Sequence, residues 1–573
     1  MPIHNKELAD IFEKTADLLE IEGANQFRVR AYRNAARIIG SQSRSVAEMV
    51  KNEEDLTTFS GIGKDLAGKI REIVETGSLP QLEKIQKQLP EGLSDLMKIP
   101  SLGPKRISQI HKELGVSTRD DLLHAARDGK IRSLEGFGEK TEQKILEELQ
   151  DSESEEHRTK YITAREIVES IMAYLDEMKA IKTAVVAGSF RRRKESVGDI
   201  DILVTCSKSK QVMDHFTEYE DVVDVISKGS TRSSVLLRSG LQIDLRAVPK
   251  VSLGAALHYF TGSKAHNIAI RKIGRKKHLK INEYGVFRGD ERIAGKTEEE
   301  VFQQIDLPFI EPELREDRGE IHAARTGSLP TLVREDDIRG DLHMHTRATD
   351  GKNTLEDMVK AARERGYQYV AITEHSPRVT MAKGLSGKDL LKRGEEIERL
   401  NERYTGITIL KSAEVDILED GSLDYSDDIL KELDLVVCSV HYNQRLSRKK
   451  QTERILRAME NPHLTILGHP TGRLINERKP YEVDLDRIMH AAVENGCFLE
   501  LNAHPDRLDL TDVQCKRAQE MGLKVAISTD AHSITDLDFM QFGVNQARRG
   551  WLEKKDVINT RTLKQLRKML KRS

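Results

Sequence analysis

Residues 188–201 combine side chains that a phosphate-transfer site needs: two aspartates, a glycine-serine pair and a cluster of arginines. Apolar runs on both sides of this segment predict two buried strands. Because strand residues i and i+2 face the same side, Asp199 and Asp201 would point into one pocket, where neighbouring carboxylates suit a divalent metal ion. The Gly188-Ser189 pair and the basic run offer N–H groups, a hydroxyl and guanidinium groups to a triphosphate.

A third carboxylate extends this pattern. Asp244 lies on the second arm of a predicted hairpin that turns at residues 238–240. A D-x-D sequence beside a basic loop can also be an ordinary solvated surface. Taken together, the three carboxylates and the glycine-serine pair favour nucleotidyl transfer. The predicted strands would have to bring these side chains into one site.

A second group of metal-binding residue types recurs in the C-terminal part of the chain. Seven strand-like segments there end in polar residues, and helical patterns separate them. This alternation is typical of a TIM-like barrel with its site on the rim formed by the strand ends. A single histidine at a strand end is usually structural, whereas a recurring set of imidazoles and carboxylates indicates Zn²⁺, Mn²⁺ or Fe²⁺ rather than Ca²⁺. The segments are 341–345, 370–375, 409–414, 436–441, 466–469, 498–502 and 525–532.

The N-terminal part contains three copies of a glycine-rich turn between helical patterns, which is the helix-hairpin-helix pattern. Such a turn presents N–H groups and a nearby lysine to a phosphate and grips DNA without reading its sequence, although any helix-helix turn favours glycine. The basic segment 27–36, with Arg28, Arg30 and Arg33, predicts a helix that either lines a groove for a 5′ end or is simply solvated. The turn residues are Gly61, Gly63, Lys64, Gly103, Lys105, Gly136, Gly138 and Lys140.

The composition narrows the class of protein. A chain of 573 residues is long enough for three to five domains. It has no apolar run that predicts a signal segment or a membrane span, and its four cysteines lie far apart, so we expect a cytoplasmic protein without disulfides or a zinc knuckle. The net charge of −2 averages over basic stretches at 264–280 and 552–573, which would provide any phosphate affinity. An ordinary solvated face is the alternative for the second stretch.

With the turn Tyr259-Phe260-Thr261-Gly262-Ser263, residues 1–317 resemble the family X DNA polymerases, the polymerase beta-like repair enzymes. Poly(A) and CCA-adding transferases share the Gly-Ser and Asp patterns but neither this turn nor the repeated hairpins. The resemblance implies that Asp199, Asp201 and Asp244 bind two Mg²⁺ or Mn²⁺ ions and catalyse nucleotide addition to a primer 3′-OH. It also implies nucleotide contacts by Gly188, Ser189, Arg192, Tyr259, Phe260, Gly262, Asn267 and Arg271, the last two on the minor-groove side.

One activity of this family depends on a lysine with a lowered pKa. Lys69 lies where some members form a Schiff base to remove a 5′-deoxyribose phosphate. Here Asp65 replaces a neighbouring lysine, and Phe27 and Arg28 replace a histidine and a lysine upstream. An adjacent acid raises the pKa of a lysine, which is the wrong direction for this chemistry, so Lys69 is only a possible lyase residue.

Residues 338–545 resemble the PHP (polymerase and histidinol phosphatase) domain. The resemblance implies two or three Mn²⁺ or Zn²⁺ ions, with Fe²⁺ as an alternative, and Glu414 bridging two of them. Asp350 stands where several PHP phosphatases have a histidine. The implied ligands are His343, His345, Asp350, His375, Glu414, His441, His469, Asp530 and His532, while Arg473, His504 and Arg507 are candidates to grip a phosphate.

The expected fold is multidomain, α/β and α+β. It joins a helical helix-hairpin-helix region, a nucleotidyltransferase palm with a mixed β-sheet and a thumb, and a distorted (β/α)7 TIM-like PHP barrel. The expected boundaries are 1–88 for the N-terminal helical DNA-binding (8-kDa-like) domain with the first hairpin, 89–158 for a fingers-like helical region with the other two, 159–250 for the palm, 251–317 for the thumb or nucleotide-selection subdomain, 318–337 for a linker and 338–573 for the PHP metallohydrolase domain.

The expected function is the filling of short gaps during base excision repair, with a metal-dependent 3′-5′ exonuclease and AP endonuclease activity at the PHP site. The expected partners are gapped or primer-template DNA and dNTPs, with no membrane and a monomeric chain. One alternative is a PHP-type phosphoesterase fused to a DNA-binding module with a non-catalytic palm. Another is a DNA-end scaffold in which both sites are remnants. Both alternatives leave complete sets of metal-binding residues unused.

Overall fold

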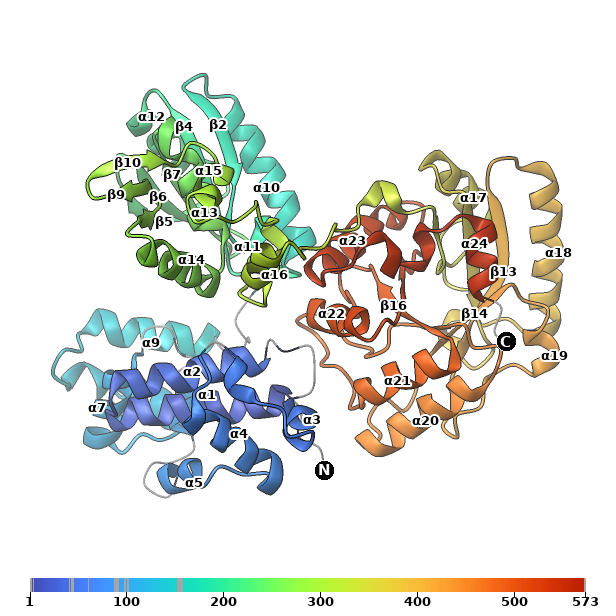
Figure 1. Ribbon diagram of the computed structural model, residues 1–573, viewed down its shortest axis with the longest axis horizontal. Coiled ribbons are helices and arrows are strands. Elements are labelled where there is room, and N and C mark those ends of the chain that lie inside the picture. Colours follow the sequence, from blue (N-terminus) through green and yellow to red (C-terminus); the bar gives the residue numbers. More distant parts are fainter. Residues whose placement is uncertain are drawn as a thin grey trace. The chain divides into compact units, whose positions relative to one another are not determined.

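The computed structural model describes most of the chain, which divides into two compact units, Met1–His157 and Arg158–Ser573 (Figure 1). No helix among the described residues is long and apolar enough to cross a membrane. The described residues are 3, 5–40, 42, 46–59, 61–86, 92–96, 99, 102–151 and 158–570. Ser60, Pro100 and Ser101 of the predicted hairpins and residues 571–572 of the C-terminal basic stretch lie outside them.

The described part of the N-terminal unit is helical. Helices α1 (Asn5–Glu22) and α2 (Gln26–Gly40) pack together, and α2 buries Tyr32, Ala35 and Ile39 at the spacing of one helical face. The helix predicted for 27–36, with Tyr and Ala on its inner face, is therefore confirmed. The other helices are α3 (Val46–Lys51), α4 (Lys64–Thr76), α5 (Pro80–Gln86), α6 (Leu93–Leu96), α7 (Pro104–Leu114), α8 (Arg119–Arg127) and α9 (Glu139–Asp151).

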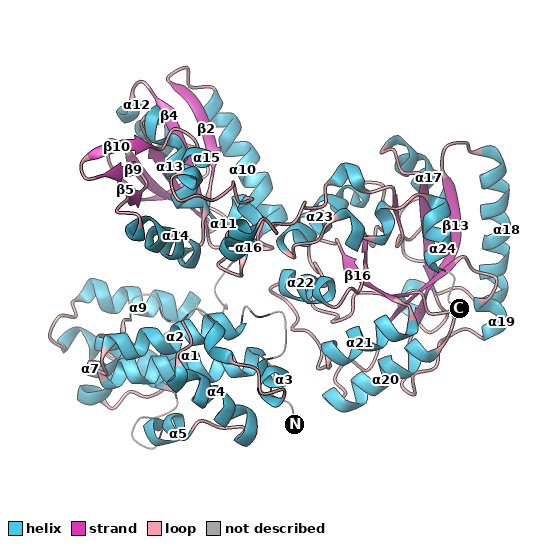
Figure 2. Cartoon of the chain, in the orientation of Figure 1, coloured by secondary structure: helices cyan, strands magenta, loops and turns pink. Residues whose placement is uncertain are grey.

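The second unit begins with a five-stranded mixed sheet, the predicted palm (Figure 2). The strand order is β2-β4-β7-β6-β5, in which β4 and β7 are parallel and the other neighbours antiparallel. Helices α10 (Tyr161–Asp176) and α12 (Ser209–Thr217) pack on the sheet and bury Ile171 and Phe216. The predicted hairpin at 238–240 joins β6 to β7. The strands are β2 (Ile181–Val186), β4 (Asp199–Cys206), β5 (Val222–Lys228), β6 (Arg232–Leu237) and β7 (Gln242–Ala247).

The predicted thumb follows the palm sheet. A separate core that includes Ile270 and Phe302 holds its helices against a three-stranded antiparallel sheet. Ser263 begins the second helix as its N-cap, because its hydroxyl accepts the His266 N–H. The elements are α13 (Leu253–Thr261), α14 (Lys264–Lys276), β8 (Lys280–Asn282), β9 (Gly285–Arg288), β10 (Glu291–Ala294) and α15 (Glu298–Gln303).

The segment expected to be a linker, 318–337, is packed and contains helix α16 (Glu320–Thr326). The carboxylate of Glu320 is fully buried, where it accepts the Arg318 N–H at 2.7 Å and contacts His266 Nδ1 at 2.6 Å. The segment also buries Leu332 and Val333, but its few apolar residues form no periodic pattern, which is why the sequence suggested a linker. The segment therefore connects the thumb to the barrel through fixed contacts.

The C-terminal part is the predicted barrel of seven parallel strands in chain order, β11 to β17 (Figure 2). The His345 N–H donates to the Ala531 carbonyl at 2.8 Å and joins the first strand to the last. The strands are β11 (Gly340–Asp341), β12 (Tyr369–His375), β13 (Thr408–Asp416), β14 (Leu435–Ser439), β15 (Ile466–Leu467), β16 (Phe498–Asn502) and β17 (Val525–Ser528).

Helices surround this barrel, and α24 packs its buried Leu566 against Leu342 and Tyr369 of the barrel core. The alternation of strands and helices confirms the expected (β/α)7 TIM-like fold, and it brings all the carboxyl ends of the strands to one rim. The helices are α17 (Leu355–Glu364), α18 (Gly387–Arg403), α19 (Asp427–Leu430), α20 (Arg448–Glu460), α21 (Leu485–Asn495), α22 (Asp512–Glu520), α23 (Met540–Arg549) and α24 (Leu563–Leu570).

Candidate active sites

The palm aspartates lie together where two parallel strands run side by side. Asp201 on β4 is in register with Asp244 on β7, and Asp199, two residues earlier, shares their side of the sheet. Gly188 has a φ of 66°, and a Cβ atom there would lie 2.9 Å from Asp201 Oδ2. This position therefore needs glycine both for its backbone conformation and for the close approach to the carboxylate.

The negative charges of this triad are only partly balanced. Burial, together with Asp199 and Asp244, raises the pKa of Asp201 to about 6. Arg232 and Arg246 lie 3.5 and 3.8 Å from Asp244 Oδ2 and offset part of the repulsion. Among the described residues, the groups of three or more ligand atoms within 4.8 Å of one another lie in the barrel, so the palm carboxylates are more widely spread. Their chemistry suits a divalent cation.

The Gly-Ser turn, residues 188–195, follows strand β2 and is tied to the thumb. Ser189 lies in a single helical turn at its start. Arg192 donates through Nε to Glu316 at 2.9 Å and through Nη1 to the carbonyl of Thr261 at 2.7 Å. The Arg192 guanidinium group, which is expected to bind a triphosphate, is thus already hydrogen-bonded to a carboxylate of the chain itself.

The turn at residues 259–263 ends α13 and leads into α14. Asn267 Nδ2 donates to the carbonyls of Tyr259 and Gly262 at 2.6 and 3.0 Å, and the side chain is buried. Its amide braces the turn rather than pointing outward. A Cβ atom on Gly262 would lie 2.7 Å from Asn267 Oδ1. Arg271 Nε donates to the Asn267 carbonyl at 3.3 Å, so the predicted nucleotide-side residues form one connected group.

In the N-terminal unit, the hairpin glycines lie where helices begin. Gly63 and Gly103 are the N-caps of α4 and α7, and both have extended backbone conformations. Gly61 and Gly136 have φ values of 111° and 78°, a region that favours glycine. Each turn thus directs N–H groups of a helix start outward, the geometry that suits a phosphate. The lysines that follow, Lys64, Lys105 and Lys140, are exposed.

Two other predicted cations of this unit are paired with acids. Arg33 Nη2 lies 2.8 Å from Asp17 and 2.7 Å from Glu20, so only Arg28 and Arg30 of the predicted groove arginines extend freely into solvent. Lys69 Nζ contacts the carboxylate of Asp65, the neighbour that the sequence already marked as unfavourable for a Schiff-base lysine.

In the barrel, Glu414 is a buried carboxylate whose two oxygens face five imidazoles. It lies near the end of β13, and its side chain is 1 % exposed. One oxygen faces three of the histidines and the other faces two, which is the geometry of a bridging ligand. From Oε2 the distances are 2.8 Å to His375 Nδ1, 3.5 Å to His343 Nε2 and 3.6 Å to His345 Nε2, and from Oε1 they are 3.0 Å to His469 Nε2 and 3.3 Å to His441 Nε2.

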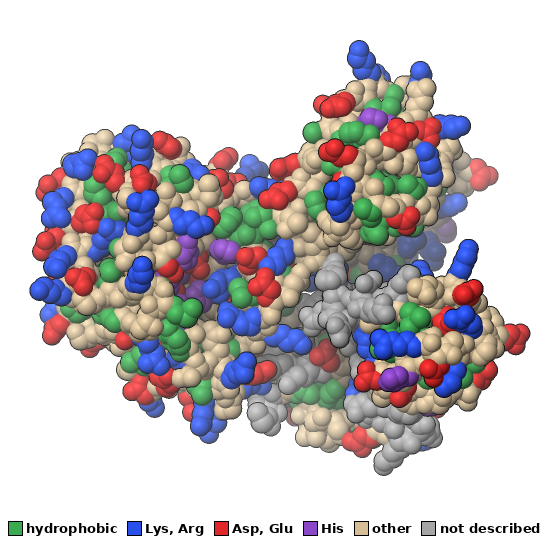
Figure 3. Space-filling model, turned by 180° about the vertical axis from the view of Figure 1, so that it is seen from behind, with side chains coloured by type: hydrophobic (Ala, Val, Ile, Leu, Met, Phe, Trp, Pro, Cys, Tyr) green, Lys and Arg blue, Asp and Glu red, His purple; other side chains and the backbone are tan. Residues whose placement is uncertain are grey.

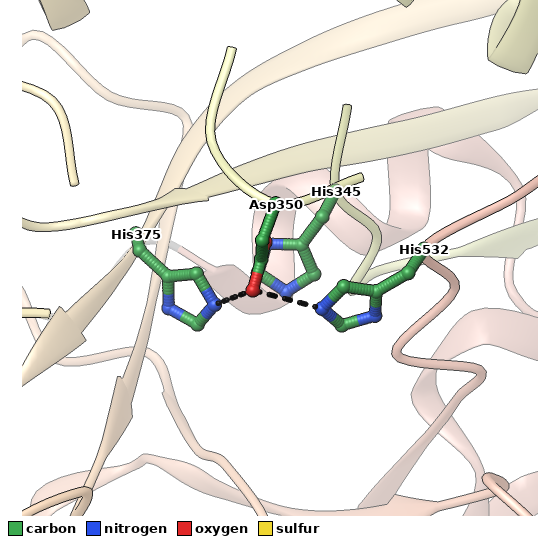
Figure 4. Close-up of side chains that lie close together, drawn as sticks. All are labelled: His345, Asp350, His375 and His532. Atoms are coloured by element: carbon green, nitrogen blue, oxygen red, sulfur yellow. Dashed lines mark ion pairs between the residues drawn. The ribbon is translucent and has the colours of Figure 1, made fainter. Parts of the chain in front are cut away.

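Asp350 completes a second group with His345, His375 and His532 (Figure 4). Its Oδ2 lies 3.3 Å from His375 Nε2 and 3.4 Å from His532 Nε2. An aspartate therefore faces this cluster where a histidine was the family alternative. Asp530 forms a third group, because its Oδ1 lies 3.3 Å from His345 Nε2 and 3.5 Å from His343 Nε2. All nine predicted barrel ligands thus lie in one connected cluster.

The donor atoms of this cluster fit divalent metal ions. Both ring nitrogens of His345 and Nε2 of His343 are buried without a hydrogen-bond partner. Buried polar atoms of this kind are rare unless they bind something. Imidazole nitrogens with carboxylate oxygens suit Mn²⁺, Zn²⁺ or Fe²⁺. Histidine side chains gather on the surface of the barrel part in Figure 3, and His441 and His532 remain 19 % and 33 % exposed, so solvent reaches the cluster.

Several buried acids that orient the histidines were missed by the sequence reasoning. Glu500 Oε1 lies 2.7 Å from His343 Nδ1, and Asp416 Oδ1 lies 3.2 Å from His441 Nδ1. Glu374 accepts the hydroxyl of Thr349 at 2.6 Å and so holds the loop that leads to Asp350. Strand position offered a signal, since Asp416 lies two residues beyond Glu414 on the same side of β13.

Arg473 does not contact the metal cluster, contrary to the expectation that it grips a phosphate there. It is 8 % exposed, and its Nη1 and Nη2 donate to the palm residue Glu195 at 3.1 and 2.6 Å. Arg507 does lie beside the cluster, with its Nε 3.7 Å from Asp530 Oδ2. His504 is partly exposed and lies just after β16, three strands along the sheet from the β13 strand that carries Glu414. Sequence alone could not distinguish these arginines, because the partner of Arg473 is distant in the chain.

Family models match the chain in order along its length and define its class. The palm, the thumb and the barrel with its histidines are those of a family X DNA polymerase that has a PHP domain. The matches are a helix-hairpin-helix domain at 3–79, a SAM-like helix-hairpin-helix tandem at 93–151, a DNA polymerase beta palm at 158–249, a DNA polymerase beta thumb at 256–316 and a PHP domain at 341–504.

Individual relatives agree with this class. The chain is 38% identical over 575 residues to the DNA polymerase/3′-5′ exonuclease PolX of Bacillus subtilis (strain 168), with 100% of both chains covered. A probable phosphatase of Thermoanaerobacter sp. (strain X514) is 30% identical over 231 residues, which are 38% of this chain and 89% of that protein. One from Caldanaerobacter subterraneus subsp. tengcongensis is 29% identical over 208 residues, 34% of this chain and 77% of its own. This chain belongs to the family X DNA polymerases with a PHP domain.

Replacing Glu500 by glutamine should weaken metal binding in the barrel. The variant loses the carboxylate that accepts the Nδ1–H of His343, so the ring loses orientation and basicity at Nε2. We expect the affinity for Mn²⁺ to fall about 10- to 100-fold, measured by titration calorimetry. Glu364→Gln, at an exposed end of α17, is the matched control. Unchanged affinity in Glu500→Gln would contradict the orienting role.

Metal binding to the barrel should release protons. Burial lowers the pKa of His375, but Glu414 and Asp350 outweigh it and raise the pKa to about 10; in the same way carboxylates raise the pKa of His441 and His532 to about 9. Carboxylates also outweigh burial at His343 and raise its pKa well above the ordinary value. Without metal these four rings hold protons at pH 7.5, so Mn²⁺ must displace several protons, and its affinity should fall as the pH falls. Calorimetry in two buffers of different ionisation enthalpy counts the protons, and binding without proton release would refute this account.

Proposed function

We propose that this chain fills short gaps in DNA at its palm and hydrolyses DNA 3′ ends at its barrel. The observation that supports this best is the presence of two separate metal-binding sets on strand ends of one compact unit: three palm aspartates, and nine histidines and acids in the barrel. The Bacillus subtilis relative, named as a polymerase and 3′-5′ exonuclease, supports assigning both activities to one chain. A role in base excision repair and incision at abasic sites are part of the proposal.

At the palm, each group of residues has a proposed task in nucleotide addition. Asp199, Asp201 and Asp244, on the parallel strands β4 and β7, would hold Mg²⁺ or Mn²⁺ ions. These ions would lower the pKa of the primer 3′-OH and neutralise charge on the leaving pyrophosphate. Ser189 and Arg192 bind the triphosphate from the Gly-Ser turn. Gly188 belongs to the same Gly-Ser turn. Tyr259 and Phe260 would contact the sugar, Gly262 shapes their turn, and Asn267 and Arg271 lie toward the minor-groove side, where Asn267 also braces the turn.

The N-terminal unit is proposed to grip DNA without reading its sequence. The exposed lysines and helix starts of the three hairpins suit phosphate contacts, which position a strand. The pairing of Lys69 with Asp65 favours this binding role over lyase chemistry. We further propose that dNTPs are the small substrates, that the chain acts as a monomer, and that the subdomain boundaries are 1–88, 89–158, 159–250, 251–317, 318–337 and 338–573.

In the barrel, the proposed reaction is hydrolysis of a phosphodiester. Two or three Mn²⁺ or Zn²⁺ ions, with Fe²⁺ as an alternative, would supply an activated water and bind phosphate oxygens. Glu414 and the surrounding histidines hold the ions, while Glu500 and Asp416 keep the rings oriented. Arg507 lies at the edge of the cluster, where a phosphate oxygen can reach its guanidinium group.

Replacing Asp244 by alanine should abolish nucleotide addition and leave DNA binding intact. The variant loses a ligand from the palm triad, and we expect extension to fall about 10³-fold, the equivalent of the several kcal/mol that a metal clamp contributes. The assay is extension of a primer at a one-nucleotide gap with dNTPs and Mn²⁺, with DNA binding measured separately. Asp224→Ala, on the exposed edge strand of the same sheet, is the control. Retained extension would sink the palm assignment and favour a non-catalytic palm.

Replacing both His343 and His345 by alanine should remove hydrolysis and spare extension. Each of these two rings contacts both Glu414 and Asp530, so the variant loses two shared ligands of the cluster. The measurement is degradation of a labelled primer without dNTPs, followed by extension with dNTPs. His490→Ala, on an exposed position of α21, is the control for the barrel fold. Loss of both activities in the double variant would argue for one shared site.

A further inference from the structure

The barrel contacts the Gly-Ser turn of the palm directly. Arg473 donates two hydrogen bonds to the carboxylate of Glu195, and Gln546 Nε2 donates a third at 3.3 Å. Arg193 of the turn contacts Asn545 on helix α23. Side chains of the barrel therefore contact the turn that is proposed to bind the triphosphate.

The most buried of these contacts is made by Arg549, the last residue of α23. Its side chain is 2 % exposed. Nη2 donates to Asp512 at 2.6 Å, and Nη1 donates to the carbonyl oxygen of Arg192 at 2.8 Å and to Glu316 Oε1 at 3.1 Å. One barrel arginine thus fixes the backbone of Arg192 and also binds the carboxylate that Arg192 itself uses.

Arg192 and Arg549 share a single carboxylate oxygen. Arg192 Nε lies 2.9 Å from the same Glu316 Oε1. Burial raises the pKa of Glu316, but Arg549 and Arg192 outweigh it and lower the pKa to about 2, so this carboxylate is ionised at every working pH. Arg318 also binds Asp512, at 2.9 Å. Three guanidinium groups therefore face two carboxylates, which leaves a positive surplus beside the Gly-Ser turn.

A carboxylate shared by two cations holds each of them less tightly than it would hold one. Without Arg549, Glu316 would keep Arg192 as its remaining guanidinium partner among the hydrogen bonds described, and the local positive surplus would disappear. An incoming triphosphate must draw Arg192 toward itself against this attraction, because both are anions competing for the same guanidinium group.

We propose that Arg549 of the barrel is a positioning residue for the polymerase reaction: it occupies Glu316 and fixes the Arg192 backbone, so that the Arg192 guanidinium is available to the triphosphate. This inference rests on the proposed nucleotide-binding role of Arg192. It makes the barrel contribute to the nucleotide affinity of the palm through Arg192 and Glu316.

The test is the steady-state kinetics of single-nucleotide gap filling by the full chain. Arg549→Met, which keeps an unbranched side chain but no charge, should raise the KM for dNTP about tenfold with kcat changed less than about twofold; tenfold corresponds to about 1.4 kcal/mol. Arg549→Lys keeps a cation that lacks the planar fork and should give an intermediate KM. Arg517→Met is the matched control, because this buried side chain pairs with the barrel residue Asp486 at 3.0 Å, and it should leave KM unchanged.

A second substitution separates positioning from simple loss of packing. In the Arg549→Met background, Glu316→Gln removes the charge that holds Arg192, so the KM for dNTP should return to within about twofold of the wild-type value. A KM that stays high or rises further would overturn the inference, as would an unchanged KM in Arg549→Met. If that variant unfolds, as judged by thermal melting, Arg549→Lys with and without Glu316→Gln provides the same comparison.

The failure of the proposed palm site would look different. Arg192→Ala should raise the KM for dNTP at least as much as Arg549→Met. If Arg192→Ala leaves KM unchanged, the nucleotide-binding role of Arg192 is wrong and the inference falls with it. If Arg192→Ala raises KM and Arg549→Met does not, the palm assignment stands and only the positioning role of Arg549 is refuted.

Discussion

The barrel depends on keeping one carboxylate, that of Glu414, buried among five histidines. Burying an ionised carboxylate costs several kcal/mol unless positive charge surrounds it. The seven parallel strands answer this requirement, since their carboxyl ends converge and bring imidazoles from β11, β12, β14 and β15 to its two oxygens. In the metal-free state protons on the histidines balance the charge, and bound metal ions would take the place of those protons.

The palm uses the same strand geometry with a different charge balance. Asp201 and Asp244 lie side by side because β4 and β7 are parallel and in register at these residues. Their charged neighbours are other carboxylates and two arginines, whereas histidines surround Glu414 in the barrel. Burial and the neighbouring carboxylates raise the pKa of Asp201, and a bound cation would relieve this repulsion. The charge of the barrel carboxylates is thus balanced by histidines, whereas that of the palm aspartates is only partly balanced by arginines. Arginines of the barrel connect the two, since Arg473 and Arg549 both bind the Gly-Ser turn.

The site residues that could be predicted from the sequence are those brought together by a regular feature of the chain, such as the alternation of side chains along a strand. Asp199 and Asp201 share a side because strand residues alternate, and the barrel ligands recur because each strand ends at the same rim. The roles that could not be predicted depend on long-range partners. Arg473 looked like a phosphate ligand, yet it pairs with Glu195, far away in the chain. The segment 318–337 looked like a linker because its buried apolar residues, such as Leu332 and Val333, form no periodic pattern and its buried Glu320 is a charged residue.

The central claim is that Glu414 lies at the middle of a multi-metal site on the same chain as a polymerase palm. Anomalous X-ray scattering at the manganese edge, from crystals of the full chain grown with Mn²⁺, tests it most directly. The account predicts separate manganese peaks on the two sides of the Glu414 carboxylate, one beside His441 and His469 and another beside His343 and His345. Crystals with manganese bound elsewhere but no peak in contact with Glu414 would contradict it.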